Sequence, residues 1–224
     1  MATPARREQD QFGPAWLARQ LQLLLPGYPK VSLCVAFSGG LDSTALLGAC
    51  AQLQPAPAQL RAVHVNHQLQ AQAAAWVRHC RRTAGKLGVP LTVRTVRVAR
   101  ARGTSLEAAA RTARYAALAT VLREGEVLLT AHHEDDQLET VLLQLLRGAG
   151  IAGLAAMPAL APFAAGSLAR PLLEVTHAQL AHWLATQPLD EPNKHEYLAQ
   201  VLSHLGMDDR VVFSSDYPDR KSVV

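Results

Sequence analysis

The stretch VSLCVAFSGGLDSTALL, residues 31–47, decides the fold of this chain. Its first seven residues are apolar and β-prone, which predicts a buried strand. The next six, Ser-Gly-Gly-Leu-Asp-Ser at 38–43, open a helix-like run, and the two glycines allow the backbone to turn sharply and approach an anion. Two serine hydroxyls and the amides at the helix N-terminus supply donors, so the segment predicts a phosphate cradle.

Asp42 within this loop needs a separate explanation. A carboxylate repels phosphate unless a cation lies between them, so we interpret Asp42 as a group linked to Mg²⁺. The loop is not of the Walker type, because the Gly-Lys-Ser/Thr ending with its phosphate-neutralising lysine is missing. A plain Gly-Gly turn after a strand is the alternative interpretation of the hexapeptide.

Strand and helix patterns alternate along the following chain. The sequence predicts strands at 31–37, 60–66, 91–98 and 127–131, and helices at 43–53, 71–87, 105–123 and 134–147. This alternation predicts an α/β fold, a doubly wound parallel sheet with right-handed crossovers and helices on both faces. The alanine-rich stretch 154–169 is a candidate linker.

Two further polar segments fall where predicted strands end. AVHVNH at 62–67 ends the second strand, and AHHEDDQLET at 131–140 follows the fourth. Because ligands bind beyond the carboxyl ends of parallel strands, these segments and the phosphate loop are expected to meet in one crevice. Asp136 and Glu139 share a helix face, so they are candidates to complete the shell of a cation or to hold an amine. An exposed acidic helix start is the alternative.

The neighbouring histidines do not predict a metal site. His64, His67, His132 and His133 are compact in sequence but lack the ligand spacing of zinc hydrolases. On a strand, Asn66 shares a face with His64, so its amide is a candidate contact for a bound ligand. Hydrogen bonding within the loop is the alternative role for His64 and His67.

Together these segments resemble the PP-loop ATP pyrophosphatases, which cleave ATP between the α- and β-phosphates, and among them the tRNA(Ile)-lysidine synthetases. The similarity extends to SLEAAAR at 105–111 followed by Arg114 and Tyr115, to the segment 153–158, and to RPLL at 170–173. It covers about residues 30–186. The resemblance implies an adenine nucleotide alpha hydrolase-like fold, with residues 1–188 forming the PP-loop domain.

The resemblance also implies a reaction. ATP adenylates the C2 oxygen of the wobble cytidine in an isoleucine tRNA with a CAU anticodon, and the ε-amine of free lysine then displaces AMP. The implied cofactors are ATP and Mg²⁺. The implied catalytic residues are Asp42, Asp136, Glu139, Arg111 and Arg170. The implied nucleotide-binding residues are Ser38, Gly39, Gly40, Leu41, Asp42, Ser43, Asn66 and His132, with Asp42 as the magnesium ligand.

Two other functions remain as alternatives. One is a thiolating PP-loop enzyme acting on another tRNA base, but such enzymes carry lysine where this loop has Leu41 and need a Cys-x-x-Cys pair, which is missing. The other is a nucleotide-binding or RNA-binding fragment without catalytic competence. A second copy of the chain is a further candidate partner, because a homodimer would supply additional surface.

Charge and length fit this class of protein. The chain has 224 residues, a formal net charge of +4 and a pI near 9.2. Its apolar runs end well before the ~20 residues of a membrane span, and its N-terminus lacks a signal-peptide pattern, so we expect a cytoplasmic protein. Cys34, Cys50 and Cys80 are odd in number and widely spaced, which argues against disulfides and against a zinc or iron–sulfur site.

Arginine supplies the excess charge, mostly in the middle third of the chain. A surface that meets phosphates is one interpretation, and a solvated helix face is the other. The residues concerned are Arg78, Arg81, Arg82, Lys86, Arg94, Arg97, Arg100, Arg102, Arg111 and Arg114.

After about residue 187 the sequence departs from the family pattern, because the expected arginine-rich segment is missing. Residues 195–212 predict a short amphipathic helix and a strand, leading into FSSDYP at 213–218. That ending looks like the metal-aspartate segment of an amidohydrolase, but fewer than forty residues cannot build a ~250-residue barrel. We expect 189–224 to be an atypical tail, from a truncated gene or a junction with an unrelated coding segment.

Overall fold

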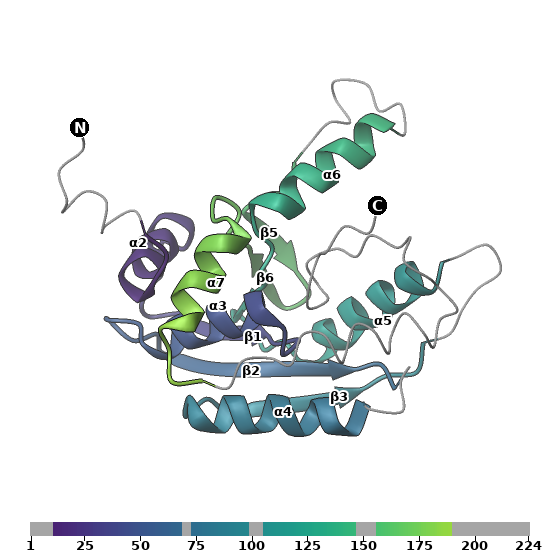
Figure 1. Cartoon of the computed structure of the whole chain (residues 1–224), viewed down its shortest axis with the longest axis horizontal. Coiled ribbons are helices and arrows are strands. Elements are labelled where there is room, and N and C mark those ends of the chain that lie inside the picture. The colour runs from purple at the N-terminus through teal and green to yellow at the C-terminus, as the bar shows by residue number, and fades with distance from the viewer. Residues whose placement is uncertain (1–10, 69–72, 99–104, 147–155, 190–224) are drawn as a thin grey trace.

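The computed structural model describes residues 11–68, 73–98, 105–146 and 156–189 (Figure 1). The strands are β1 (Ser32–Ala36), β2 (Gln59–Asn66), β3 (Leu91–Thr95), β4 (Val127–Leu129), β5 (Leu160–Phe163) and β6 (Gly166–Ala169). The helices are α2 (Pro14–Leu24), α3 (Leu41–Ala51), α4 (Ala73–Lys86), α5 (Leu106–Val121), α6 (Glu134–Leu146) and α7 (His177–Ala185). The predicted strands and helices match β1–β4 and α3–α6 to within a few residues at each end.

The strands form one sheet in the order β3-β2-β1-β4-β6-β5. Every neighbouring pair is parallel except β5 and β6. The chain winds outward from β1 in one direction through β2 and β3, and from β4 in the other through β6. The sheet is therefore doubly wound, as predicted, and the strand order reverses between β1 and β4, where such folds bind ligands.

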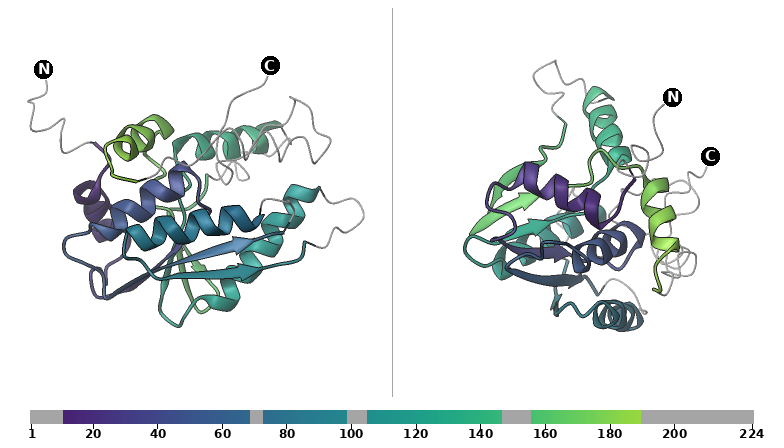
Figure 2. Two further views of the ribbon diagram at one scale, coloured as in Figure 1. Left: turned by 60° about the horizontal axis from the view of Figure 1, so that its bottom comes forward. Right: turned by 90° about the vertical axis from the view of Figure 1, so that its left-hand side faces the viewer.

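Alternate residues of β1 face opposite sides of the sheet, and each side has its own core. Leu33 and Val35 are fully buried with residues of α2, α3, α4 and α7. Cys34 lies on the other side, where Leu118 and Leu122 from α5 and its end pack with Val63. The predicted placement of helices on both faces is thus confirmed, and α2, α3 and α7 gather on one side (Figure 1 and Figure 2).

The predicted linker at 154–169 is wrong over its described part, because residues 160–169 form the β5–β6 hairpin. Alanine and proline are poor strand formers, so the local sequence hides these strands. Pro162 is tolerated because β5 lies at the edge of the sheet. Gly166 is required by close packing, since a Cβ atom there would lie 2.0 Å from the Glu126 carbonyl oxygen.

Helices α2 and α7, which the periodicity analysis did not predict, pack around α3. The ring of Phe12, just before α2, meets Trp183 of α7 edge to face at 5.3 Å between centroids. Trp183 also lies against Gly48 of α3, where a Cβ would approach the indole to 3.2 Å. The small residue lets α7 run close beside α3, and this brings the start of α7 to the phosphate loop.

Helix α6 projects away from the body of the molecule (Figure 1). Asp136 is its one buried residue. The exposed side chains on its outer turns are leucines: Leu138, Leu142, Leu143, Leu145 and Leu146. The acidic first turn therefore lies at the base of the helix, against the sheet, while the apolar turns extend beyond it.

A buried ion pair joins the amino ends of two strands. Arg61 of β2 donates from Nε to Oε1 of Glu126, just before β4, at 2.7 Å, and a second bond joins Nη2 to Oε2. The Arg123 amide also donates to Glu126. Burial alone would raise the pKa of Glu126, but the hydrogen bonds from Arg61 and Arg123 outweigh it and lower that pKa. This pair lies at the edge of the sheet opposite the phosphate loop.

No helix in the described part of the chain is long and apolar enough to cross a membrane. The three cysteines are free, buried thiols. Residues 190–224, which include the predicted tail with its helix and strand, lie outside the described residues, and so do 99–104 with two of the predicted arginines.

Candidate functional site

The loop between β1 and α3 has the shape predicted for a phosphate cradle. Gly39 has φ +89°, a left-handed conformation that favours glycine. Its amide donates to Ser43 Oγ at 3.1 Å, and the Gly40 amide donates to Ser38 Oγ at 3.3 Å. The two serine oxygens lie 2.9 Å apart. Leu41 begins α3, so Asp42 stands in its first turn, where the helix dipole favours an anion.

Side chains from α4 and β2 hold this loop from behind. Trp76 Nε1 donates to the Ser38 carbonyl at 2.7 Å, and the Cys80 thiol approaches the same oxygen at 3.6 Å. His64 Nδ1 lies 2.9 Å from the Phe37 carbonyl. Because a carbonyl only accepts, Nδ1 carries the proton. Burial lowers the pKa of His64, and burial raises the pKa of Cys80 to about 12, so both groups are neutral supports.

Gly39 is also fixed by packing. A Cβ atom at this position would lie 2.6 Å from Cys80 Sγ and 3.2 Å from the Trp76 ring. Contacts under about 3 Å force something to move, and here the neighbours are themselves bonded to the loop. The phosphate loop and helix α4 therefore form one unit.

Asp42 lies between two imidazoles. Its Oδ2 is 3.7 Å from His133 Nε2, and its Oδ1 is 3.7 Å from His177 Nε2. The two rings are 5.8 Å apart between centroids. His133 is fully buried, whereas the His177 side chain is 35% exposed. Asp42 thus lies beside one interior histidine and one at the surface.

Asp136 approaches the same histidine from α6. Its Oδ2 accepts a hydrogen bond from the His133 amide at 2.8 Å and lies 3.9 Å from His133 Nε2. Asp135 reaches the other ring nitrogen, with Oδ2 3.5 Å from Nδ1. The two neighbours differ in exposure: the Asp135 side chain is 43% exposed and that of Asp136 only 4%. The chain therefore brings Asp42 and Asp136 together across the strand-order reversal.

The other predicted residues lie along the same edge. Glu139 is half-buried one turn beyond Asp136. His132 is buried, with Nδ1 2.8 Å from Thr130 Oγ1. Asn66 ends β2, and its Oδ1 accepts from the Gln68 amide at 3.0 Å. The nucleotide and acceptor contacts expected of these residues stay predictions.

The two predicted arginines come from different elements. Arg111, in α5, lies over the Tyr115 ring at 5.2 Å from its centroid. Arg170 follows β6 at the carboxyl edge and donates from Nη1 to the Pro158 carbonyl at 2.8 Å. Its Nε is buried and makes no hydrogen bond within the described residues, so that donor is available to a ligand.

The carboxylates suit a magnesium ion bound together with phosphate. Within the part of the chain that the structure describes, no three His, Cys, Asp or Glu side chains gather as a self-sufficient metal site. Mg²⁺ at phosphate sites uses one or two protein carboxylates, with phosphate oxygens and waters completing its shell. Asp42, buried beside the phosphate loop, fits that donor set.

Two residues of the site were missed from the sequence. His133 was discounted with the other histidines, although its place directly before the acidic run put it near the site. His177 gave no signal as a functional residue. The sequence does carry a signal for the start of α7, because Thr176 and Gln179 form a capping box.

Comparisons with known proteins extend these observations. A family model described as the PP-loop domain matches residues 15–194. The chain is 53% identical over 192 residues to the tRNA(Ile)-lysidine synthase of Alkalilimnicola ehrlichii, covering 83% of this chain and 42% of that protein. It is 53% identical over 175 residues to the protein of the same name from Pseudomonas aeruginosa, covering 77% and 39%. The chain thus spans about two fifths of the length of these curated relatives.

A solved structure shares the fold. The U34-tRNA thiolase NcsA from Methanococcus maripaludis superimposes with a TM-score of 0.62 at 15% identity, over 85% of this chain and 71% of that one. At this level of identity the likeness concerns the architecture of the sheet and its helices.

Proposed function

The chain belongs to the PP-loop domain family, and on that basis we propose that it ligates lysine to C2 of the wobble cytidine in an isoleucine tRNA with a CAU anticodon. ATP is consumed to AMP and pyrophosphate. The observation that carries the proposal is the meeting of Asp42 and Asp136 at His133 beside the phosphate loop. The relatives named tRNA(Ile)-lysidine synthase, at 53% identity, supply the substrate class.

In the first step the C2 oxygen of the cytidine attacks the α-phosphorus of ATP. A bond forms between them, and the bond from the α-phosphorus to the leaving pyrophosphate breaks. The amides at the start of α3 and the hydroxyls of Ser38 and Ser43 are suited to hold the pyrophosphate. Asp42 would hold Mg²⁺, which would neutralise phosphate charge there. Arg170 is suited to bind the α-phosphate, because its Nε is buried at this edge.

In the second step the lysine amine attacks C2 of the adenylated base and displaces AMP. The ε-ammonium must first lose a proton, and the carboxylates of Asp136 and Glu139 are its candidate acceptors. The same two carboxylates also attract the ε-ammonium of lysine before it is deprotonated. Arg111, stacked on Tyr115, is assigned to the phosphate of the intermediate, where a guanidinium can bind two oxygens at once.

Pyrophosphate release tests this proposal. Purified protein with ATP and Mg²⁺ is compared without tRNA, with isoleucine tRNA carrying a CAU anticodon, and with elongator methionine tRNA, each with and without lysine. We expect release that depends on the isoleucine tRNA, and incorporation of labelled lysine into that tRNA. ATP binding without release under any condition would refute the ligase and support the alternative of a nucleotide-binding domain.

A further inference from the structure

In one long segment of the chain, every charged side chain is basic. No aspartate or glutamate occurs between Asp42 and Glu107, whereas arginines and a lysine recur throughout. Helix α4 lies in the middle of this segment. Its acid-free sequence, AAAWVRHCRRTAGK, leaves its cations without acidic neighbours on the same helix.

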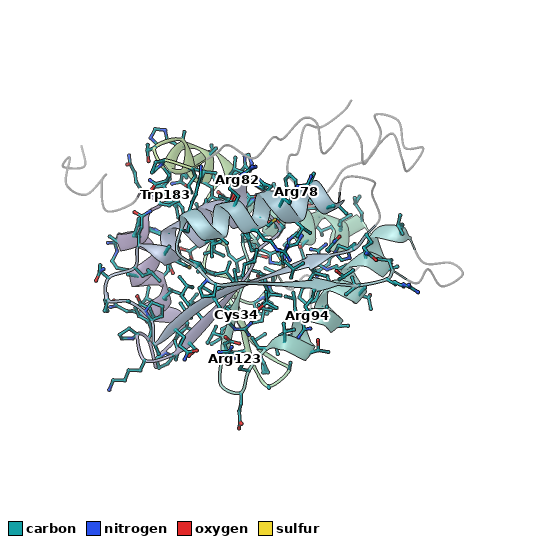
Figure 3. The ribbon with its side chains drawn as sticks, turned by 90° about the horizontal axis from the view of Figure 1, so that it is seen from below. Cys34, Arg78, Arg82, Arg94, Arg123 and Trp183 are labelled. Carbon is teal, nitrogen blue, oxygen red and sulfur yellow. The ribbon has the colours of Figure 1, made fainter. Side chains whose placement is uncertain are left out.

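The cations of α4 lie on one side. Val77, Cys80, Thr83 and Ala84 are buried against the sheet. Arg78, Arg81, Arg82 and Lys86 are exposed at spacings of three and four residues, which places them in one stripe. We call these four residues the basic face of α4. Figure 3 looks onto this helix, with Arg78 and Arg82 labelled along it.

Such a row of like charges lowers the stability of the helix that carries it. Like charges three or four residues apart on a helix repel each other. The cost turns into a gain when the row meets a polyanion, because each cation that contacts a phosphate releases a condensed counterion. The arrangement therefore fits a ligand with regularly spaced negative charges.

We propose that the basic face of α4 binds the phosphate backbone of the substrate RNA, outside the reacting nucleotide. This inference rests on the proposed function for the identity of the RNA. It adds a docking surface that is separate from the phosphate loop and from the acidic residues of α6.

The position of α4 supports this role. Trp76 and Cys80, on the inner side of the helix, contact the Ser38 carbonyl of the phosphate loop. Arg78 and Arg81 stand in the same two turns and face outward. An α-helix with its side chains is about 10–12 Å across. A nucleic-acid strand on the basic face thus lies one helix diameter from the loop that holds ATP.

The composition of the exposed side favours RNA over a lipid surface. A helix that lies on a membrane places large apolar residues beside its cations and inserts them. The exposed neighbours of the basic face are Ala74, Ala75 and Gly85, and the larger apolar side chains of α4 face the core. The surface can attract a phosphate backbone but has nothing to insert.

The test compares two variants that lose the same charge. Arg78→Gln/Arg81→Gln alters the basic face, and Arg19→Gln/Arg123→Gln removes two exposed arginines from α2 and from the amino edge of the sheet. Fluorescence anisotropy measures the Kd of each full-length protein for isoleucine and methionine tRNA over a series of salt concentrations. Thermal unfolding and ATP binding confirm that both variants are folded.

We expect the basic-face variant to bind both tRNAs on the order of tenfold more weakly at low salt. The slope of log K against log salt should fall by roughly 1.5, since each phosphate contact contributes about 0.7–0.9. The loss should be equal for the two tRNAs, because backbone contacts do not read sequence. The control variant should stay within about twofold of the parent, because most exposed arginines contact no phosphate.

Other outcomes overturn the inference in distinguishable ways. If the parent releases pyrophosphate with isoleucine tRNA but the two variants bind it equally well, the α4 surface is wrong and the proposed function stands. If the parent neither binds tRNA nor releases pyrophosphate, both fail together. If the basic-face variant loses only binding to phosphatidylglycerol vesicles, the surface belongs to a membrane and the RNA assignment is refuted.

Discussion

The imidazole of His177 stands 3.7 Å from the carboxylate of Asp42, although the two residues begin different helices more than a hundred positions apart. The contact exists because α7 packs closely along α3, where Gly48 makes room for Trp183. Asp42 is therefore oriented from two sides, by His133 and by His177. A carboxylate held in this way needs little reorganisation when it meets a phosphate-bound cation.

The first prediction concerns that second imidazole. His177→Ala should weaken binding of ATP with Mg²⁺ about tenfold, or about 1.4 kcal/mol, because Asp42 is then held from one side. Isothermal titration calorimetry measures the Kd. His182→Ala is the matched control, since it removes an exposed histidine from the last turn of the same helix. Equal affinities in the two variants would mean that His177 does not position Asp42.

Asp136 should be required for turnover and not for folding. Asp136→Asn keeps an oxygen that can accept from the His133 amide but removes the charge. We expect lysine transfer to fall at least 100-fold, as for loss of a general base, while the melting temperature stays close to that of the parent. Asp135→Asn, one residue earlier and partly exposed, should lose less than about threefold on the same scale. Unchanged transfer in Asp136→Asn would remove this residue from the mechanism.

Gly39 should tolerate no side chain. Gly39→Ala forces a left-handed φ, costing about 1–2 kcal/mol, and drives Cβ toward Cys80 Sγ. Both effects act on the phosphate loop, so ATP affinity should fall together with the free energy of unfolding. Gly85→Ala is the control, because nothing lies within 4 Å of its added Cβ. In the last turn of α4 that change should not lower the free energy of unfolding and should add at most about 0.5–1 kcal/mol, measured by urea unfolding.

The ion pair at the opposite edge should govern acid stability. The pKa of Glu126 is lowered in the folded protein, so its stabilisation is present above the unfolded value near 4.5 and is lost as pH falls through the folded value. Glu126→Gln should cost about 3 kcal/mol or more at pH 7, because Arg61 is left buried and unpaired. The variant should also show a shallower loss of stability between pH 5 and 3 than the parent. Parallel pH dependences would contradict this account.

The sequence predicted the central half of the fold well, for a physical reason. β1 and α3 are apolar, close to the switch point and bounded by glycines or polar loops, so local pattern and tertiary environment agree. The β5–β6 hairpin was missed because alanine, proline and glycine do not signal a strand. In the folded protein these residues fit their positions. Pro162 lies in the edge strand, and Gly166 leaves room for the backbone of Glu126.

The candidate site divides in the same way. Ser38, Gly39, Asp42 and Asp136 were predicted because they sit at strand ends, and all parallel strands of one sheet bring such ends to one edge. His177 could not be predicted, since its role depends on how α7 packs along α3, which no local pattern encodes. The contacts of Trp76 and Cys80 with the loop depend in the same way on the packing of α4.

The buried pair of Arg61 and Glu126 lies at one end of the strands, and the carboxylates and histidines lie at the other. The ion pair that joins the strands at their amino ends is therefore separate from the candidate ligand-binding residues. Substitutions of Asp42, Asp136 or His177 therefore leave the Arg61–Glu126 pair intact. Variants of this kind are suited to testing the candidate site, because a change in their ligand binding does not arise from loss of that pair.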